Sequence, residues 1–222
     1  MERTAGRLSR LLSNLAQGRR ERRLGAVVRD LWEQHFYVIR YRWFMGAIPE
    51  PLGPQDGQGW RLLSPGETEA WVKGHRERDP SHQKMYDVAL ENKHFLFAAF
   101  DGDTVVGRLW LGRDWTYFPS PQFLMVRFPS DMAYSYDHFV AREYRRRGIG
   151  GAGYLYRLQT ARGLGFRRIS AAMLKTNRVG QRNWMGLRIP CWDALQVVIA
   201  GRAYYVEGRP WRRLGATVVA EG

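Results

Sequence analysis

The segment at residues 140–153 restricts the possible folds more than any other part of the chain. It reads Val-Ala-Arg-Glu-Tyr-Arg-Arg-Arg-Gly-Ile-Gly-Gly-Ala-Gly: the end of an apolar run, an arginine–glycine loop, and the start of helical periodicity. Glycines let a ligand approach the backbone, and a helix N-terminus presents free N–H groups and a positive dipole end. Arginines add forked donors for phosphate oxygens. The segment fits a diphosphate site, but also an ordinary strand–turn–helix connection with solvated charges.

The composition is that of a globular protein. The 222 residues are enough for one domain with a full core and an extension, and 45% of them are hydrophobic. No apolar run approaches the roughly 20 residues that span a bilayer, and the first residues lack the apolar core of a signal peptide. The single cysteine, Cys191, excludes an internal disulfide, and no Cys/His cluster has zinc-ligand spacing. We therefore expect a cytoplasmic protein without a bound metal.

The net charge of +14 indicates anionic partners without choosing among them. Residues 1–30 hold eight arginines against three acidic residues, and their leucines recur at helical spacing. Such a helix can lie on an anionic membrane, here through residues 1–35, or pack on its own domain or on a second subunit of a homodimer. We favour packing. Nucleic acid remains an open alternative, although the chain has no recognisable RNA-binding motif.

Periodicity along the chain predicts a regular α/β series. Expected strands are 36–44, 60–63, 95–100, 104–111, 122–128, 133–140, 166–173, 194–199 and 202–206, and expected helices are 64–75, 81–92, 177–187 and one from the arginine–glycine loop to about 163. Asp101-Gly102-Asp103 is a strong hairpin signal. We divide the chain into a basic N-terminal extension with a linker (1–58), one domain (59–207) and a C-terminal tail (208–222).

These features, in this order, resemble the GNAT superfamily of acyl-CoA-dependent N-acyltransferases over residues 59–207. The superfamily motif Arg/Gln-x-x-Gly-x-Gly/Ala is matched by residues 145–150, although Arg142 stands where proline is frequent. The hairpin followed by Val-Val-Gly at 105–107 and the Gly-Phe-Arg-Arg-Ile at 165–169 are also similar to the family pattern. The resemblance implies an α/β (α+β) fold with a mixed, mostly antiparallel central sheet flanked by helices.

The resemblance also implies transfer of an acyl group, usually from acetyl-CoA, to an amine. The residues that would bind the pyrophosphate are Arg145, Arg146, Arg147, Gly148, Ile149, Gly150 and Gly151. The main chain of His138, Phe139 and Val140 would pair with the pantetheine arm. Asn177 matches the asparagine that opens the family's later helix and would also contact the cofactor.

Two neighbouring residues are candidates for the general base. An ammonium must lose a proton before it attacks a thioester, and Asp137 and His138 are the nearest titratable residues before the loop. The ordinary pKa of histidine suits this role. Strand alternation lets only one of them face the cleft unless a bulge intervenes. Alternatively, one faces solvent and the other is a satisfied polar group in the core.

The general acid is harder to assign. A tyrosine of the later helix often protonates the leaving thiolate in the family, and its position falls on Trp184, which cannot donate a proton to sulfur. Tyr204 or Tyr205 could substitute, although aromatic residues in a terminal hairpin more often pack. The Gly-Phe that usually ends this helix is also absent, with Arg-Ile-Pro at 188–190.

Three functions remain open at this level. The first is N-acetylation of a small-molecule amine, such as an amino sugar. The second is acylation of a macromolecular amine such as aminoacyl-tRNA, which the charge favours. The third is a non-catalytic acyl-CoA-binding or membrane-surface module. A dinucleotide site fits less well, because no Asp or Glu lies between Tyr144 and Trp192 to bind a ribose.

Overall fold

The computed structural model describes residues 36–50, 59–77, 82–118, 124–199, 202–207 and 217–220. The basic helices predicted within residues 1–35 lie outside these ranges. In chain order the elements are β1 (Phe36–Ala47), β2 (Trp60–Leu62), α3 (Pro65–Arg76), α4 (Gln83–Glu91), β3 (Phe95–Asp101), β4 (Thr104–Gly112), β5 (Trp115–Phe118), β6 (Leu124–Arg127), β7 (Met132–Val140), the 3₁₀ turn η2 (Arg142–Tyr144), α5 (Ile149–Gly163), β8 (Arg168–Leu174), α6 (Arg178–Gly186), β9 (Cys191–Ile199), β10 (Arg202–Glu207) and β11 (Thr217–Ala220).

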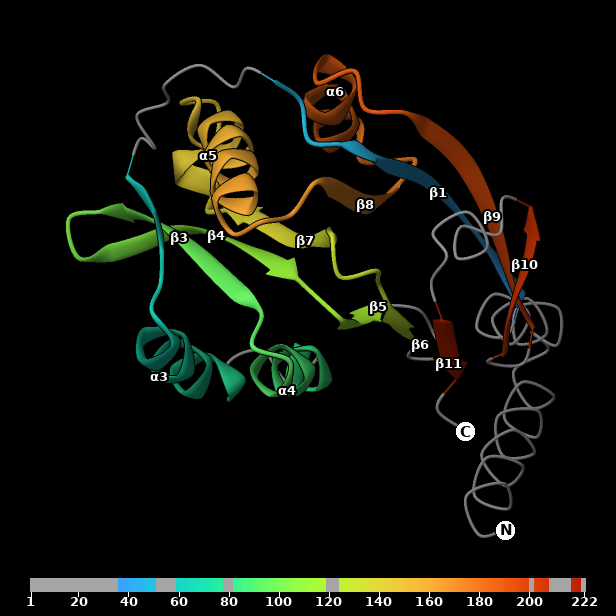
Figure 1. Ribbon diagram of the computed structural model, residues 1–222, viewed down its shortest axis with the longest axis horizontal. Helices are drawn as coiled ribbons and strands as arrows, with labels where there is room; N and C mark the ends of the chain where they lie inside the picture. The colour runs from blue at the N-terminus through green and yellow to red at the C-terminus, as the bar shows by residue number, and fades with distance from the viewer. Residues whose placement is uncertain are drawn as a thin grey trace, which may run out of the picture.

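A central eight-stranded sheet organises the described part of the chain. Its strand order is β10-β9-β1-β8-β7-β4-β3-β2. The pair β7–β8 is parallel and every other pair of this sheet is antiparallel. Helices α3 and α4 cover one face and α5 and α6 cover the other (Figure 1), each over its own apolar core. The predicted mixed, mostly antiparallel sheet flanked by helices is therefore confirmed.

The parallel pair β7–β8 separates part of the way along. Backbone pairing runs from Met132 opposite Arg168 to Ser135 opposite Ala171, and the two strands then continue apart to Val140 and Leu174. The backbone groups on the facing edges beyond Ser135 are therefore available to a bound molecule, because a strand edge without a neighbour presents free N–H and C=O groups. This V-shaped opening, which we call the splay, widens toward the N-termini of α5 and α6.

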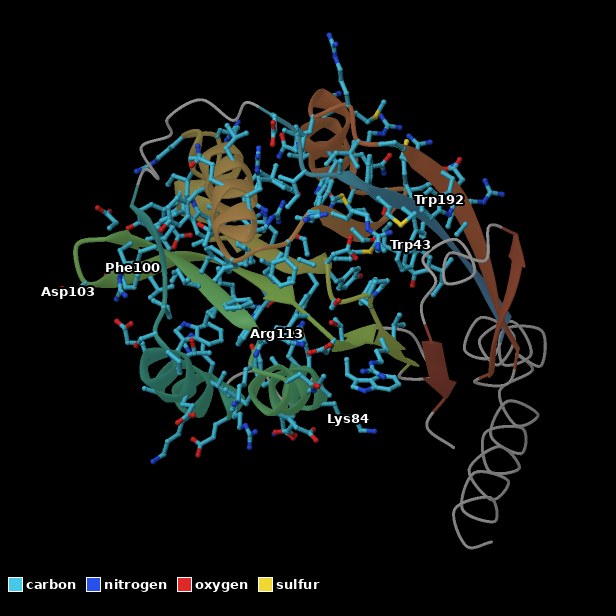
Figure 2. The ribbon with its side chains drawn as sticks, in the orientation of Figure 1. Trp43, Lys84, Phe100, Asp103, Arg113 and Trp192 are labelled. Carbon is cyan, nitrogen blue, oxygen red and sulfur yellow. The ribbon has the colours of Figure 1, made fainter. Side chains whose placement is uncertain are left out.

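Strand β1 lies inside the central sheet, between β8 and β9. Its neighbouring residues Trp43 and Phe44 are fully buried on opposite faces, in the cores under α3–α4 and α5–α6 respectively. Trp43 faces its cross-strand partner Trp192 of β9 (Figure 2). Burying a large apolar side chain contributes roughly 1.5–3 kcal/mol. Residues 36–47, which the sequence assigns to the N-terminal extension, are therefore part of the sheet.

Most predicted elements occur within two or three residues of their expected ends. Helix α3 begins as its sequence indicates: the Ser64 hydroxyl accepts from the Glu67 N–H, and the Glu67 carboxylate accepts from the Ser64 N–H. The sequence did not predict β5, nor β11 in the segment expected to be a tail. These two short strands form a second sheet with β6, in the order β11-β6-β5. Runs of four residues carry too little periodicity to be recognised alone.

Candidate active site

The arginine–glycine loop ends in an uncapped helix N-terminus. Gly148 is the N-cap residue of α5, with a left-handed φ of 82°, and no side chain caps the helix. The first intrahelical bond runs from the Ala152 N–H to the Gly148 carbonyl. Helix geometry therefore leaves the N–H groups at 149–151 without an intrahelical acceptor. Together with the positive end of the helix dipole, they suit an anion.

Three exposed arginines surround this N-terminus. The Arg145 Nε donates to the Val140 carbonyl at 2.9 Å and ties the loop to the end of β7. Arg146 has a left-handed φ of 64°, which costs a non-glycine residue roughly 1 kcal/mol. None of Arg145, Arg146 and Arg147 forms an ion pair with an acidic residue of the described chain. Three positive charges are thus available to a ligand at 145–150.

A β-bulge separates the two candidate bases. Phe139 pairs with Arg108 of β4 and Tyr136 pairs with Trp110, so that Asp137 and His138 together oppose the single residue between them. Asp137 adopts the φ of 45° that this extra residue requires. As a result the two neighbouring side chains do not follow simple strand alternation.

Asp137 turns toward the α3–α4 face of the sheet. Its carboxylate accepts from Arg108 Nε at 2.7 Å and from Nη2 at 3.3 Å, and both side chains are mostly buried. The Arg108 guanidinium in turn lies over the ring of Trp71 in α3, at 5.7 Å from its centroid, and over that of Phe139 at 5.1 Å. This packing holds the carboxylate in one orientation at the splay.

His138 turns toward the α5–α6 face. Its ring lies 4.5 Å from the Tyr154 ring and 5.7 Å from the Trp60 ring, measured between centroids. Although the residue as a whole is half-buried, both ring nitrogens are closed off from solvent and have no hydrogen-bond partner among the described residues. Burial, together with the positive charge of Arg157, lowers the pKa of His138 to about 3. The imidazole is therefore neutral at physiological pH.

Three successive positions of helix α5 lie against β7, from the open end of the splay (its mouth) to the point where β7 and β8 pair again (its vertex). At the mouth, a Cβ atom placed on Gly150 would lie 3.8 Å from Val140 Cγ2 and 3.9 Å from His138 Nε2. One turn further, Tyr154 contacts His138. At the vertex, Arg157 donates through Nη1 to the hydroxyl of Ser135, the last residue of β7 that pairs with β8. These three α5 residues are spaced by three or four positions, so they share one helix face, which lies along β7 from the mouth to the vertex.

The residue at the position where the family often has a proton-donating tyrosine is buried in the core. Trp184 of α6 is fully buried, with its ring centroid 5.6 Å from that of Phe44 and 6.0 Å from that of Tyr154. Tyr204 and Tyr205 belong to β10, and their side chains lie outside the described part of the structure.

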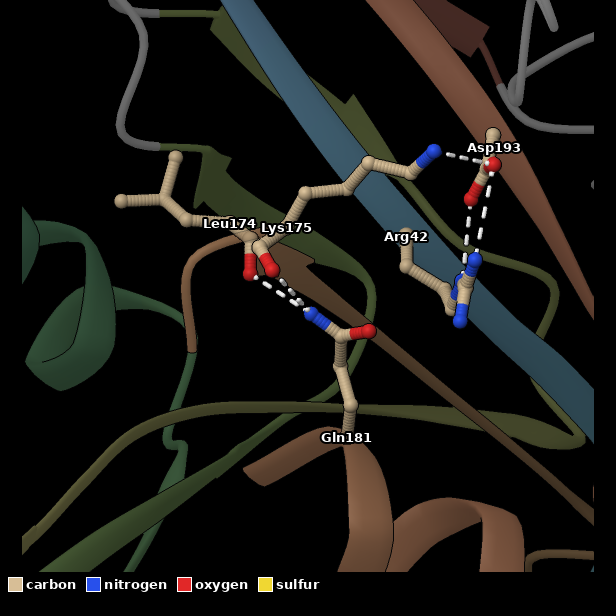
Figure 3. A network of polar contacts seen from close by, with 5 residues as sticks. All are labelled: Arg42, Leu174, Lys175, Gln181 and Asp193. Carbon is tan, nitrogen blue, oxygen red and sulfur yellow. Dashed lines mark hydrogen bonds and ion pairs between the residues drawn. The ribbon is translucent and has the colours of Figure 1, made fainter. Parts of the chain in front are cut away.

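A polar network fixes the end of β8 after it has left β7. Asp193 of β9 binds Arg42 of β1 at 2.9 Å and Lys175 at 2.6 Å, while the Gln181 amide donates to the carbonyls of Leu174 and Lys175 (Figure 3). The hydrogen bond from Arg42 and the one from Lys175 lower the pKa of Asp193 against the opposing effect of its partial burial. These contacts hold the end of β8 in place where it no longer pairs with β7.

The start of α6 lies beside a basic groove. Asn177 is the N-cap residue of this helix, and its side-chain oxygen accepts from the Gly180 N–H at 3.0 Å, so that the oxygen is already occupied. The groove has a volume of about 720 Å³ and is lined by Ile39, Arg40, Leu174, Lys175, Thr176 and Arg178.

Sequence reasoning missed the arginines of this site. Arg108 directly follows Gly107 in its predicted strand and looks like a solvated charge. Arg157 had a usable signal, because it shares a helical face with Tyr154, Leu158 and Ala161, all of which are buried. An arginine on the apolar face of a predicted helix indicates a buried or ligand-facing charge.

Two kinds of site do not occur in the described part of the chain. No three His, Cys, Asp or Glu side chains within it gather closely enough to hold a metal ion. None of its helices is long and apolar enough to cross a membrane.

Comparison with solved structures finds similar chains at low sequence identity. A functionally unknown conserved protein from Staphylococcus epidermidis ATCC 12228 is 9% identical, with a TM-score of 0.51, over 79% of this chain and 67% of its own. The aminoglycoside N-acetyltransferase AAC(6')-Iy in complex with CoA is 15% identical, with a TM-score of 0.42, over 68% and 98%. The aminoglycoside acetyltransferase meta-AAC0020 from an uncultured soil metagenomic sample is 16% identical, with a TM-score of 0.42, over 58% and 86%.

Family membership follows from the sequence match rather than from these structures. No curated protein matches the sequence significantly. The model of the Acetyltransferase (GNAT) family matches residues 60–184, which run from β2 through the loop and α5 to α6. Because this match covers more than half of the chain, the protein belongs to the GNAT acetyltransferase family of acyl-CoA-dependent N-acyltransferases.

Proposed function

We propose that this protein transfers an acetyl group from acetyl-CoA to the primary amine of a small molecule, with Asp137 as the general base. The observation that carries the proposal is the joint position of the α5 N-terminus and the splay. Free N–H groups and three arginines lie at the mouth, and the unpaired edges of β7 and β8 lead from there to the bulge.

The residues present fit an acyl-CoA. Gly148, Gly150 and Gly151 leave the backbone at the mouth open, and a Cβ atom on Gly151 would meet nothing within 4 Å. The loop therefore suits a diphosphate. Beyond it, the main chain of His138, Phe139 and Val140 on the edge of β7 suits the amides of a pantetheine arm. Acetyl-CoA, when bound, supplies an acyl group activated as a thioester.

The two candidate bases have different environments, and these favour Asp137. A base must accept a proton from the ammonium, directly or through one water. Burial of the His138 ring disfavours its protonated form, and the ring is enclosed by Trp60, Tyr154 and α5. The Asp137 carboxylate is oriented by Arg108 at the bulge, where the edge of β7 that faces β8 is open. In this assignment Arg108 orients the carboxylate, and His138 acts through its main chain.

Donor binding is tested by filling the mouth of the splay. Gly150→Leu would place a side chain beside Val140 and His138, and we expect the Kd for CoA to rise at least a hundredfold in isothermal titration calorimetry. The matched control is Gly163→Leu at the other end of α5, where a Cβ atom would meet nothing within 4 Å. An unchanged Kd in the Gly150 variant would exclude this loop as the diphosphate site.

The base assignment is tested by removing one charge. Asp137→Asn should lower kcat by roughly 10²–10⁴-fold, the usual contribution of a general base, while the Kd for CoA stays close to that of the wild type. Asp131→Asn is the matched control, because it breaks a second Arg–Asp pair, with Arg168, at the closed end of β7. If both variants retain the wild-type kcat, the base is another group.

The acceptor is tested by measuring free thiol released from acetyl-CoA in the presence of a panel of amines. We expect release that depends on a small-molecule amine, with amino sugars and aminoglycosides included in the panel. Mass spectrometry of the protein as purified would identify a retained CoA species and its acyl length. Donor binding without release for any amine, or release only with aminoacyl-tRNA, would contradict the proposed small-molecule reaction.

A further inference from the structure

Arg157 is a buried cation for which the described residues provide no counter-ion. Its side chain has no solvent exposure, and Nε and Nη2 have no hydrogen-bond partner among the described residues. The only polar contact found for it there is the one from Nη1 to the Ser135 hydroxyl. The neighbouring sequence also offers no counter-ion, because no Asp or Glu occurs between Tyr144 and Trp192, a range that includes all of α5, β8 and α6.

Such an arrangement is costly unless an anion completes it. Removing an ion from water costs several kcal/mol, and buried charges are normally paired. The guanidinium lies 4.7 Å from the Tyr154 ring centroid and 5.2 Å from that of Trp184, contacts that recover part of this cost. Burial lowers the pKa of Arg157 to about 10, so the side chain still carries its charge at neutral pH.

The depth of Arg157 in the splay identifies the anion. It contacts Ser135 at the vertex, whereas the diphosphate loop lies at the mouth beyond Val140. Extended strand from Val140 to Ser135 covers roughly 16 Å, which is comparable with the extended length of a phosphopantetheine arm from diphosphate to sulfur. The sulfur end of the proposed donor therefore reaches the level of Arg157.

We propose that the Arg157 guanidinium is the counter-ion for the sulfur of CoA when it leaves as a thiolate. This inference rests on the proposed donor. In the transfer, Asp137 first accepts a proton from the ammonium and releases it to water. The amine nitrogen then bonds to the acyl carbon, the C–S bond breaks with its electron pair going to sulfur, and the second proton that nitrogen loses passes to Asp137. A fixed positive charge in a dry site stabilises the negative charge that develops on sulfur. Protonation of Asp137 and formation of the thiolate beside Arg157 thus occur on opposite faces of the sheet.

The other groups near this position do not compete for the role. On the α5–α6 face, His138 is neutral, and burial raises the pKa of Tyr154, which keeps its hydroxyl protonated. On the opposite face, Asp137 and Arg108 pair with each other. Arg157 is therefore the positive charge to which a thiolate in the splay would respond.

The test measures the ionisation of bound CoA rather than turnover. The ultraviolet absorbance of the thiolate gives the thiol pKa of CoA free and bound, and calorimetry compares the Kd for CoA with that for desulfo-CoA across the same pH range. In the wild type we expect the bound thiol pKa to fall by at least one unit. The affinity of CoA relative to desulfo-CoA should then begin to rise at the bound thiol pKa and reach a gain of about tenfold above the free thiol pKa.

Variants assign the effect to one side chain. Arg157→Met keeps the side-chain length without the charge and should return the thiol pKa to its free value, with the Kd for desulfo-CoA unchanged. Arg157→Lys keeps the charge and should retain much of the shift. Arg162→Met is the matched control on the same helix, because Arg162 is partly exposed and pairs with Glu50. Unfolding curves show whether each variant is folded.

Each failure has a distinct reading. If neither CoA nor desulfo-CoA binds the wild-type protein, the proposed donor is wrong. If both bind but the thiol pKa in the wild type equals that of free CoA, the counter-ion role is overturned without recourse to any variant. It is also overturned if Arg157→Met retains the full shift, or if that variant loses affinity only for acyl-CoAs with a carboxylate in the acyl group, such as succinyl-CoA.

Discussion

At the scale of single residues, the site depends on how charge is distributed across one bulge. The Asp137 carboxylate lies on the α3–α4 face, where Arg108 binds it, whereas on the other face burial lowers the pKa of His138 and disfavours the imidazolium. Two adjacent residues in one strand therefore have different surroundings. The bulge produces this difference, because it turns the two neighbouring side chains to opposite faces of the sheet.

Buried neutral histidines predict a loss of stability in mild acid. His94 accepts from the Tyr136 hydroxyl at 2.7 Å and donates to the carbonyls of Arg113 and Trp115, and burial lowers its pKa to about 4. Its unfolded pKa near 6.5 means that the unfolded chain binds more protons below that pH. Stability is thus full above about pH 6.5 and is lost as the pH falls toward the folded pKa.

We expect His94→Asn to remove roughly 2 kcal/mol of the stability difference between pH 7 and pH 5. The measurement is the free energy of unfolding in urea at both pH values, so that the loss of hydrogen bonds, which lowers stability at both, cancels. His75→Gln in α3 is the matched histidine control. An unaltered pH dependence in the His94 variant would show that this imidazole is not buried as described.

Sequence alone could name the residues at the bulge but not their surroundings. Asp137 and His138 stand out because they are titratable and lie just before the loop. Which face each occupies depends on the register of β7 against β4, and the depressed pKa of His138 depends on Trp60 and Tyr154. Those contacts join segments far apart in the chain, so no local pattern encodes them.

At the scale of elements, α5 is positioned by one tryptophan beneath its first turns. The Trp60 indole of β2 donates to the Ile149 carbonyl at 2.8 Å. Its ring lies so close to α5 that a Cβ atom on Gly153 would come within 2.6 Å of it. The glycine at 153 thus allows the helix to approach the sheet edge, which in turn places the uncapped N-terminus at the mouth of the splay.

A pair of alanine substitutions in α5 tests this close approach. Gly153→Ala should destabilise the protein by roughly 1–3 kcal/mol through overpacking against a rigid ring. Gly151→Ala faces open space and should stabilise it by roughly 0.5–1 kcal/mol, because glycine is a poor helix former. Urea unfolding measures both changes. Equal effects from the two substitutions would contradict the proposed packing.

The strand–loop–helix unit was predictable because its signals are local. A β-rich run, left-handed turn residues and a 3.6-residue apolar period occur together at 133–163. The capping box of α3 was visible for the same reason. The insertion of β1 between β8 and β9 was not visible, because a strand pattern gives no information about its pairing partner.

At the scale of the whole molecule, the central sheet depends on β1. Removing it would leave β8 and β9 without the strand that joins them and would expose the cores around Trp43 and Phe44. A chain that lacks residues 1–47 should therefore be insoluble or should lose cooperative unfolding. A chain that lacks only residues 1–35 keeps β1 and is the reference. Circular dichroism with thermal melting measures both, and a folded, cooperative 48–222 fragment would contradict the prediction.

The same placement of β1 sets an order on folding during synthesis. β1 pairs with residues 168–174 and 191–199, which the ribosome makes long after it. Strands β2, β3, β4 and β7 are neighbours in the sheet and are made before these partners, and β3 and β4 are joined by a tight hairpin. Strand β1 must wait with its apolar side chains unshielded. Long-range pairings of this kind form slowly, and the partly folded intermediates that precede them are prone to aggregate. Chaperone demand and expression yield should therefore respond to mutations in β1 more strongly than activity does.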